Sequence, residues 1–257
     1  MNVVTQILEN KRQEVSQLPA TQRTQRTGPD FVASCKSSTP FIIAEIKPHS
    51  PAGETLLDRS QIQAVLQDYN QYAQAISVLC DQKFFHGGFD LLKEVAAQTH
   101  LPILAKEFII STKQIHLAAQ AGASAILLIP GLLEEELTLE LLHEALACDL
   151  DVLIEFHGPE DLNQSLSAAI AKLDPEKILL GVNNRNLQDL KIDLKTTENF
   201  IPQLKSTFGP DYLYVSESGI SQPEDALKLT QHADGLLIGT ALLKPDDRPQ
   251  FFNKIFS

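Results

Sequence analysis

Charged and amide side chains follow most of the short apolar runs in this sequence. A lysine or arginine binds an anionic substrate and a glutamate exchanges protons with it, so a group drawn from separate runs indicates acid–base chemistry on an anion. A single charged residue in such a position is more often a solvated loop residue, and only the convergence of several favours a site. The candidates are Glu45, Lys47, Lys83, Lys106, Glu155, Asn183, Arg185 and Glu217.

Two of these candidates belong to one apolar run and carry opposite charges. Glu45 and Lys47 stand two residues apart, so their side chains point to the same side of a strand. If that side faces the protein interior, the two charges need each other or a ligand, because an unpaired buried charge is costly.

Two glycine turns near the end of the chain predict a phosphate site. The first is Ser218-Gly219-Ile220-Ser221, for which we expect Ser221 to cap the following helix in a capping box with Glu224. The second is Gly239-Thr240. Backbone N–H groups at helix starts bind phosphate. Glycines also serve ordinary tight turns, so both interpretations stay open.

Eight apolar runs alternate with segments of helical periodicity, such as Ile62, Val65, Leu66 and Tyr69. Near-continuous apolar runs are typical of parallel strands covered by helices. Eight such units favour a closed (β/α)8 TIM barrel over an open doubly wound sheet, because no G-x-G-x-x-G follows the first run. The charged candidates would then meet at the carboxyl ends of the strands. The predicted strands are 41–46, 75–79, 102–105, 123–129, 151–155, 177–182, 212–215 and 235–238.

An additional helix is predicted before the first strand. Ile7, Leu8, Lys11, Val15 and Leu18 have amphipathic spacing, and residues 22–29 read as a loop. We treat residues 1–40 as an N-terminal helical extension within a single domain of residues 1–257. The leading helix either plugs the amino-terminal face of the barrel or helps to cover the substrate site.

Composition excludes several classes of protein. The chain has 257 residues, with 33 acidic and 21 basic side chains and a formal net charge of -12, which argues against nucleic-acid binding. The first residues have no apolar stretch like that of a signal peptide and no apolar run is long enough to span a membrane, so we expect neither feature. Cys35, Cys80 and Cys148 are too far apart to predict a disulfide framework or a zinc site. We expect a cytoplasmic protein with reduced thiols.

Five segments in order resemble the indole-3-glycerol-phosphate synthase family: 43–53, 76–90, 102–109, 181–187 and 215–220. The resemblance covers nearly the whole chain and includes the leading helix. It implies a lyase of tryptophan biosynthesis that converts a phosphorylated small molecule, 1-(2-carboxyphenylamino)-1-deoxyribulose 5-phosphate, to indole-3-glycerol phosphate, carbon dioxide and water. It also implies that no metal or organic cofactor is needed, and it leaves protein partners open.

The resemblance assigns expected roles residue by residue. Lys106 is the expected general acid at the ketone oxygen, and Glu155 is the expected acid/base group of the later dehydration. Glu45 and Lys47 are expected to contact the reacting carboxylate and hydroxyls, and Lys83 is expected to take part in dehydration. The expected substrate contacts are Ser50, Phe108, Asn183, Arg185, Glu217 and Ser218, and the expected phosphate residues are Ser218, Gly219, Gly239 and Thr240. Phe84, Phe85 and Phe89 are further candidates to flank the aromatic ring of the substrate, and packing is the alternative for each.

The sequence departs from the family pattern at several positions beside the expected site. These are Pro48 and His49 after Lys47, Ala52, Glu107 within Lys106-Glu107-Phe108, and Thr240 after Gly239. They bear on the strength of phosphate and carboxylate binding and on the placement of Lys106.

Two other functions are weighed against the synthase. Phosphoribosylanthranilate isomerase, another barrel, uses a cysteine, and no cysteine ends the first predicted strand. A non-catalytic barrel that binds a phosphorylated ligand need not preserve Glu45, Lys47, Lys106 and Glu155, all of which are present.

Overall fold

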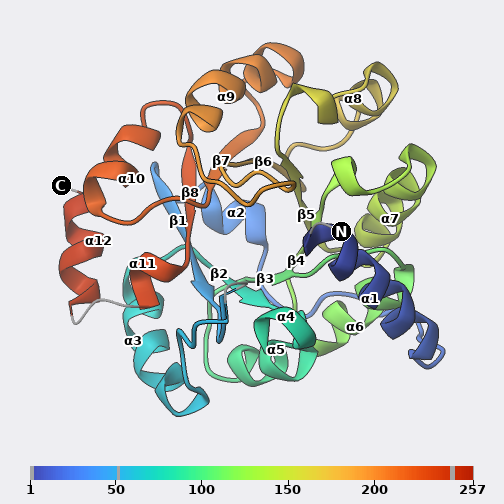
Figure 1. Cartoon of the computed structure of the whole chain (residues 1–257), viewed down its shortest axis with the longest axis horizontal. Coiled ribbons are helices and arrows are strands. Elements are labelled where there is room, and N and C mark those ends of the chain that lie inside the picture. Colours follow the sequence, from blue (N-terminus) through green and yellow to red (C-terminus); the bar gives the residue numbers. More distant parts are fainter. Residues whose placement is uncertain (1–2, 51–52, 244–246, 257) are drawn as a thin grey trace.

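The chain folds into a closed barrel of eight parallel strands (Figure 1), seen in a computed structural model that describes residues 3–50, 53–243 and 247–256. Each strand pairs with its sequence neighbours, and β1 also pairs with β8, which closes the sheet. The predicted (β/α)8 barrel is confirmed. The strands are β1 (Phe41–Ile46), β2 (Ala75–Leu79), β3 (Ile103–Lys106), β4 (Ala125–Leu128), β5 (Asp151–Phe156), β6 (Ile178–Asn183), β7 (Leu213–Glu217) and β8 (Gly235–Ile238).

Helices surround the ring of strands (Figure 1). Within the described residues, none is long and apolar enough to cross a membrane. They are α1 (Val3–Gln17), α2 (Phe31–Cys35), α3 (Ile62–Tyr72), α4 (Gln82–Phe85), α5 (Phe89–Ala96), α6 (Thr112–Ala121), α7 (Glu135–Ala147), α8 (Gln164–Ile170), α9 (Lys195–Phe208), α10 (Pro223–Leu229), α11 (Thr240–Leu243) and α12 (Arg248–Phe256). Three single turns complete them: η1 (Arg59–Gln61), η2 (Pro130–Leu132) and η3 (Pro159–Asp161).

Alternation along each strand divides the core into two layers. Phe41 and Ile43 of β1 belong to the cluster inside the barrel, whereas Ile42 and Ala44 belong to the cluster between strands and helices. Both faces are therefore apolar, which explains why the strands read as continuous apolar runs. Glu45 continues the inward row of Phe41 and Ile43, so its carboxyl group enters the barrel at the carboxyl end.

Four strands extend beyond their predicted ends, β5 by the apolar Phe156 and the other three by polar residues. β3 includes Lys106, β6 includes Asn183 and β7 includes Glu217, all of which hydropathy had placed in the following loops. Each of these polar residues continues the strand's hydrogen-bonded register with its neighbour. Candidate functional side chains thus stand on rigid strands, where their direction is fixed by the pleat.

Helix α2 closes the amino-terminal face of the barrel. Asp151, the first residue of β5, accepts hydrogen bonds from the backbone N–H groups of Phe31 (2.8 Å) and Val32 (2.9 Å) at the start of α2. The Phe31 side chain is fully buried in the cluster inside the barrel. This end of the barrel is therefore a packed structural face.

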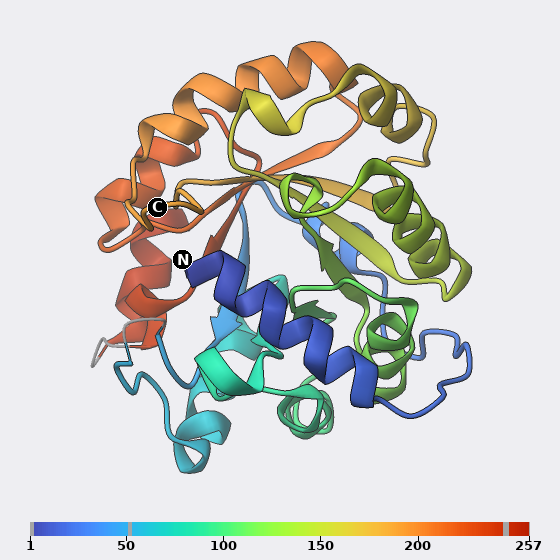
Figure 2. The same cartoon turned by 45° about the vertical axis from the view of Figure 1, so that its right-hand side comes forward.

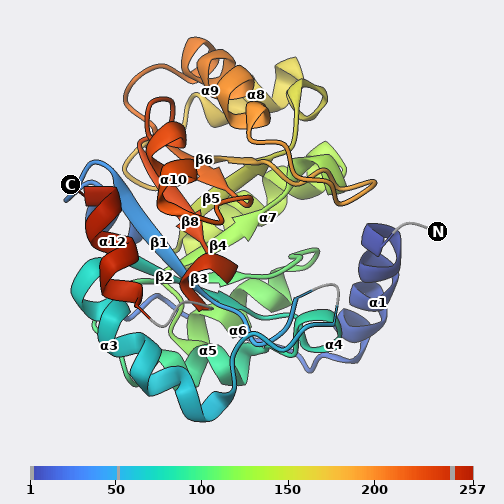
Figure 3. The same ribbon diagram turned by 60° about the vertical axis from the view of Figure 1, so that its left-hand side comes forward.

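Helix α1 lies at the opposite face, across the mouth of the barrel (Figures 2 and 3). Its Lys11 is 2 % exposed, and its Nζ lies 2.9 Å from Asp81 Oδ2 and 3.0 Å from Glu107 Oε2. Of the two positions that the sequence left open for the leading helix, α1 takes the one at the carboxyl face, and the amino-terminal face is closed by α2, a helix that the sequence analysis did not predict.

Replacing Lys11 with Met tests this anchor. Burial raises the pKa of Glu107 to about 7 even with the Lys11 charge beside it. A raised carboxyl pKa means that the folded state keeps a proton which the unfolded chain releases, so stability falls as pH rises from 4.5 to about 7. Without Lys11 the pKa of Glu107 rises further, and the loss of stability grows with pH.

We expect Lys11→Met to lower the free energy of unfolding by about 3 to 5 kcal/mol at pH 8, and by less at pH 6. Urea denaturation at both pH values measures this, with Lys93→Met, at an exposed site on α5, as the control. An equal loss at the two pH values would contradict the account.

Candidate functional site

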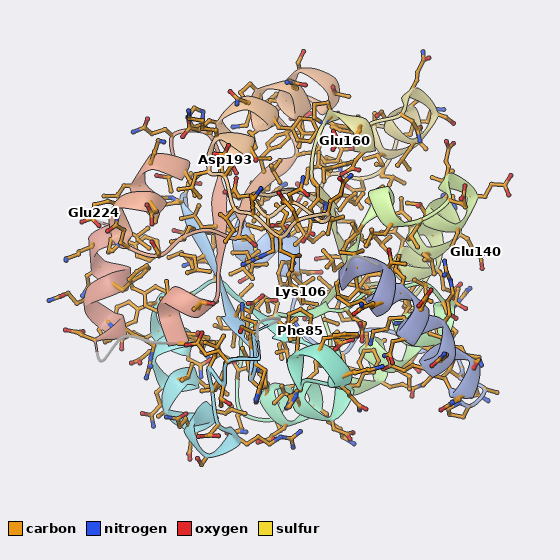
Figure 4. The ribbon with its side chains drawn as sticks, in the orientation of Figure 1. Phe85, Lys106, Glu140, Glu160, Asp193 and Glu224 are labelled. Carbon is orange, nitrogen blue, oxygen red and sulfur yellow. The ribbon has the colours of Figure 1, made fainter. Side chains whose placement is uncertain are left out.

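A cavity of about 680 Å³ opens at the carboxyl ends of the strands. Twelve of the fourteen predicted site residues line it: Glu45, Lys47, Lys106, Phe108, Glu155, Asn183, Arg185, Glu217, Ser218, Gly219, Gly239 and Thr240. Figure 4 shows Lys106 at the middle of the ring with Phe85 near it, and Glu140, Glu160, Asp193 and Glu224 farther out.

The Lys106 ammonium group stands between two buried carboxyl groups. Its Nζ donates to Glu155 Oε2 at 2.8 Å and to Glu217 Oε2 at 2.7 Å. The three residues come from β3, β5 and β7, and each side chain points inward because it continues the inward row of its strand. The barrel thus brings together residues that are 49 and 111 positions apart.

Further hydrogen bonds fix the orientation of Glu155. Asn183 Nδ2 donates to Glu155 Oε1 at 3.0 Å. The amide of Asn183 is itself oriented, because its Oδ1 accepts the backbone N–H of Arg185 at 3.0 Å. Both oxygens of the Glu155 carboxylate therefore have defined partners, Lys106 on one side and Asn183 on the other.

The same burial acts differently on the two glutamates. Burial by itself would raise the pKa of Glu155, but the Lys106 charge and nearby hydrogen bonds hold it well below its usual value. Burial and the negative charge of Glu155 raise the pKa of Glu217 to about 8. Burial would lower the pKa of Lys106, but its carboxylate neighbours outweigh burial and raise it. The site therefore holds an ammonium ion, an ionised carboxylate and a carboxyl group that is protonated near neutral pH.

A second ion pair lies at the end of β1. Lys47 Nζ is 2.7 Å from Glu45 Oε1, which is the first of the two alternatives, mutual pairing or a ligand, that their spacing left open. Gly239, after β8, provides the room, because a Cβ atom there would lie 2.3 Å from Glu45 Oε1 and 3.1 Å from Lys47 Nζ. The φ of Gly239 is not positive, so the lack of space for a side chain, and not the backbone conformation, explains the glycine.

The glycine turn after β7 has an unusual backbone. Ser218 (φ 64°) and Gly219 (φ 90°) are both left-handed, and both line the cavity. The predicted capping box of Ser221 with Glu224 is wrong. Instead α10 begins at Pro223 with Gln222 as N-cap. Asp225 Oδ2 accepts from the Ser221 hydroxyl (2.7 Å) and from the backbone N–H groups of Ser221 and Gln222. Asp225 thus accepts from three donors that precede the helix, whereas Glu224, one position earlier, does not face them.

Apolar side chains form the remaining wall. Phe108 lines the cavity, and of the three other aromatic candidates only Phe85 does so. Sequence reasoning missed as site residues the apolar side chains that α1, the end of β4 and the loops contribute: Val4, Ile7, Leu127, Ile129, Leu187, Leu190 and Ile192. The loop after β6 contains three apolar residues close together, Leu187, Leu190 and Ile192. This could have identified them from the sequence, because apolar side chains gathered in a loop are typical of a binding surface.

Two predicted residues do not line the cavity. Lys83 is exposed on α4, and its Nζ donates to Asn10 Oδ1 of α1 at 2.9 Å. Ser50 caps its own loop, since its Oγ accepts the backbone N–H of Glu54 at 3.2 Å. A role of Lys83 in dehydration stays a prediction, and it requires the side chain to leave Asn10. Ala52, one of the departures, lies outside the described residues.

One group of potential metal ligands lies away from the cavity. Within the described part of the chain, His116, Glu144 and Cys148 have ligand atoms within 4.8 Å of one another. Glu144 is already engaged, because the Arg23 guanidinium donates to both of its carboxylate oxygens. In this structure the Glu144 carboxylate is therefore paired with an arginine side chain.

Replacing Glu217 with Gln tests the protonated carboxyl group. Because the pKa of Glu217 is raised from 4.5 to about 8, the folded state binds a proton that the unfolded chain releases between these pH values. Wild-type stability therefore falls across this window by up to about 1.4 kcal/mol per pH unit. A glutamine, which mimics the neutral form, avoids this loss.

We expect Glu217→Gln to be close to the wild type in stability at pH 5 and more stable than it at pH 9, measured by urea denaturation. Glu140→Gln, at an exposed site on α7, is the control and should show no such crossover. A stability difference for Glu217→Gln that does not change with pH would contradict the raised pKa.

Comparison with known proteins identifies the family to which the chain is similar. The sequence model of the family described as indole-3-glycerol phosphate synthase matches residues 2–255. The indole-3-glycerol phosphate synthase of Thermococcus kodakarensis is 39% identical over 225 residues, which are 86% of this chain and 93% of that protein. That of Listeria monocytogenes serovar 1/2a is 37% identical over 248 residues, or 95% and 94% of the two chains.

A solved structure supports the fold alone. The crystal structure of tryptophan synthase subunit alpha from Legionella pneumophila matches with a TM-score of 0.61 and 13% identity, over 88% of this chain and 95% of that one. The family match over nearly the whole length, together with the two relatives, goes further than the fold: this chain belongs to the indole-3-glycerol phosphate synthase family.

Proposed function

We propose that this chain is a carboxy-lyase of tryptophan biosynthesis that forms indole-3-glycerol phosphate from 1-(2-carboxyphenylamino)-1-deoxyribulose 5-phosphate. The observation that carries the proposal is the Lys106 ammonium group, held between Glu155 and Glu217 inside the cavity. It is a proton donor with two carboxyl groups beside it, which is what successive ring closure and dehydration require. The activity would belong to a single domain of residues 1–257 in the cytoplasm, with no metal or organic cofactor.

In the first step, Lys106 is the general acid. The aromatic carbon that bears the carboxylate attacks the ketone carbon, and Lys106 gives its proton to the ketone oxygen, which becomes a hydroxyl. Loss of carbon dioxide then leaves its electron pair in the ring and restores aromaticity. The neighbouring carboxyl groups favour the charged lysine, so the donor is present in its protonated form at neutral pH.

In the second step, Glu155 is the acid/base group. The new hydroxyl leaves as water after taking up a proton, and the adjacent carbon of the new ring releases a proton, which gives the indole. A carboxylate that is held ionised and oriented by Asn183 is suited to take that proton. Glu217 keeps Lys106 in place and contacts the substrate from β7.

The rest of the cavity would bind the remaining parts of the substrate. Phe108 and Phe85 offer apolar faces for the anthranilate ring. Lys47, paired with Glu45, and Arg185 offer positive charge to the substrate carboxylate. The phosphate would lie at the turns of Ser218, Gly219, Gly239 and Thr240, with Ser50 near this end.

The test of the function is turnover of this substrate, followed by indole absorbance. We expect the wild type to be active and Lys106→Met to lose at least about 100-fold in kcat, since an essential acid/base group contributes at least that much. Lys172→Met, on the surface after α8, is the control. A wild type that binds the substrate without turning it over would favour the alternative of a non-catalytic phosphate-ligand-binding barrel.

Glu155→Gln should stall a different step. Glutamine has nearly the same shape as glutamate but cannot accept and return a proton. Carbon dioxide release should continue while indole formation is slowed, so that a hydroxylated indoline accumulates. Single-turnover measurements of both products decide this, and Lys106→Met should stop before carbon dioxide release. Simultaneous appearance of carbon dioxide and indole in Glu155→Gln, with both slowed, would refute the division of roles.

A further inference from the structure

His157 is a buried histidine beside the cavity to which the reaction gives no role. It follows β5 directly and stands two residues after Glu155, so the two side chains lie on the same side of the chain. Its side chain is 5 % exposed. Neither ring nitrogen has a well-aligned hydrogen bond within the described part of the chain, and buried polar atoms without partners are rare enough to require a reason.

Both ring nitrogens face carboxylates. His157 Nε2 lies 3.1 Å from Glu155 Oε1, and Nδ1 lies 3.8 Å from Asp161 Oδ2. The contact with Glu155 is at hydrogen-bond distance, although its N–H direction is not well aligned. The oxygen that His157 faces is the one that Asn183 also contacts, opposite the oxygen bound to Lys106.

Asp161 is fixed in place behind the histidine. Its Oδ2 accepts the backbone N–H of His157 at 2.6 Å. Its Oδ1 occupies the space over Gly131 of η2, where a Cβ atom would lie only 2.3 Å away. The imidazole therefore stands between a carboxylate that cannot move easily and the carboxylate of Glu155. In many active sites a further group orients the catalytic base. Here Glu155 is the base and His157 stands where such an orienting group would be.

We propose that His157 is a positioning residue for Glu155: Nε2–H donates to Glu155 Oε1, and Asp161 holds the residue in the place that allows this through its hydrogen bond with the backbone N–H of His157. The proposal deepens the proposed function, because it assigns to His157 the step that Glu155 carries out. With Lys106 on one oxygen, and Asn183 and His157 on the other, the carboxylate keeps one orientation while it accepts and returns a proton. Substrate binding does not involve His157.

Two variants at position 157 separate positioning from mere packing. In His157→Leu the donor is lost, and we expect kcat to fall by about 10-fold to 100-fold with little change in KM, since a small misplacement of a reacting group costs up to that much. In His157→Gln the side-chain amide can occupy the place of Nε2, so most of kcat should return. His143→Leu, at an exposed site on α7, is the control.

The step that is slowed gives a second readout, which a loss of folding would not reproduce. In single turnovers of His157→Leu, carbon dioxide release should match the wild type while indole formation lags, as with Glu155→Gln but less severely. The proposal is overturned if His157→Leu keeps wild-type kcat, if carbon dioxide release slows equally, or if His157→Gln is as slow as His157→Leu. An inactive wild type would instead refute the proposed function, so the two failures are distinguishable.

Discussion

The structure of the site depends on one interaction, the ammonium group of Lys106 between the carboxyl groups of Glu155 and Glu217. A charge removed from water is costly unless it is paired at close range, and each member of this group makes the burial of the others possible. The three residues come from three alternate strands. The barrel must therefore be closed and in register before Lys106 can pair with either glutamate. The site forms only when the whole barrel has folded.

The residue after Lys106 ties the amino-terminal extension to the same strand end. Lys106 points into the barrel, and Glu107 contacts Lys11 of α1. Glu107 is one of the departures from the family pattern, and its side chain presents a carboxyl group to Lys11. Because α1 also contributes Val4 and Ile7 to the cavity wall, this ion pair links the cover of the site to the strand that carries its central lysine.

The two ends of the barrel have different functions: one stabilises the fold and the other forms the site. At the amino-terminal end, Asp151 anchors α2 and the Phe31 side chain fills the interior. At the carboxyl end, the inward rows change from apolar to charged residues, and the loops leave a cavity. This division is general to the fold. It lets polar groups accumulate at one end, while burial of apolar side chains at the other end stabilises the chain.

The sequence by itself determined the class of fold and most of the candidate residues. Apolar runs long enough for strands, with helical periodicity between them, are local patterns, and a charged residue at the end of such a run is visible without a structure. Glu45 and Lys47 were predicted to lie on the same side of a strand, and so to need each other or a ligand, because a spacing of two is a property of a strand alone.

Tertiary structure alone decided which of these residues meet. The pairing of Lys106 with Glu155 and Glu217 spans 49 and 111 residues, and no local pattern encodes such a distance. The same holds for Lys83, which follows an apolar run but is turned toward Asn10 of α1 by its position on α4. The cap of α10 also needed the structure, because both Glu224 and Asp225 are acidic and only the structure shows which of them faces the donors of Ser221 and Gln222. The sequence shows which residues are acidic or basic. A shifted pKa, such as that of Glu217, arises from burial and neighbouring charges, which only the closed barrel supplies.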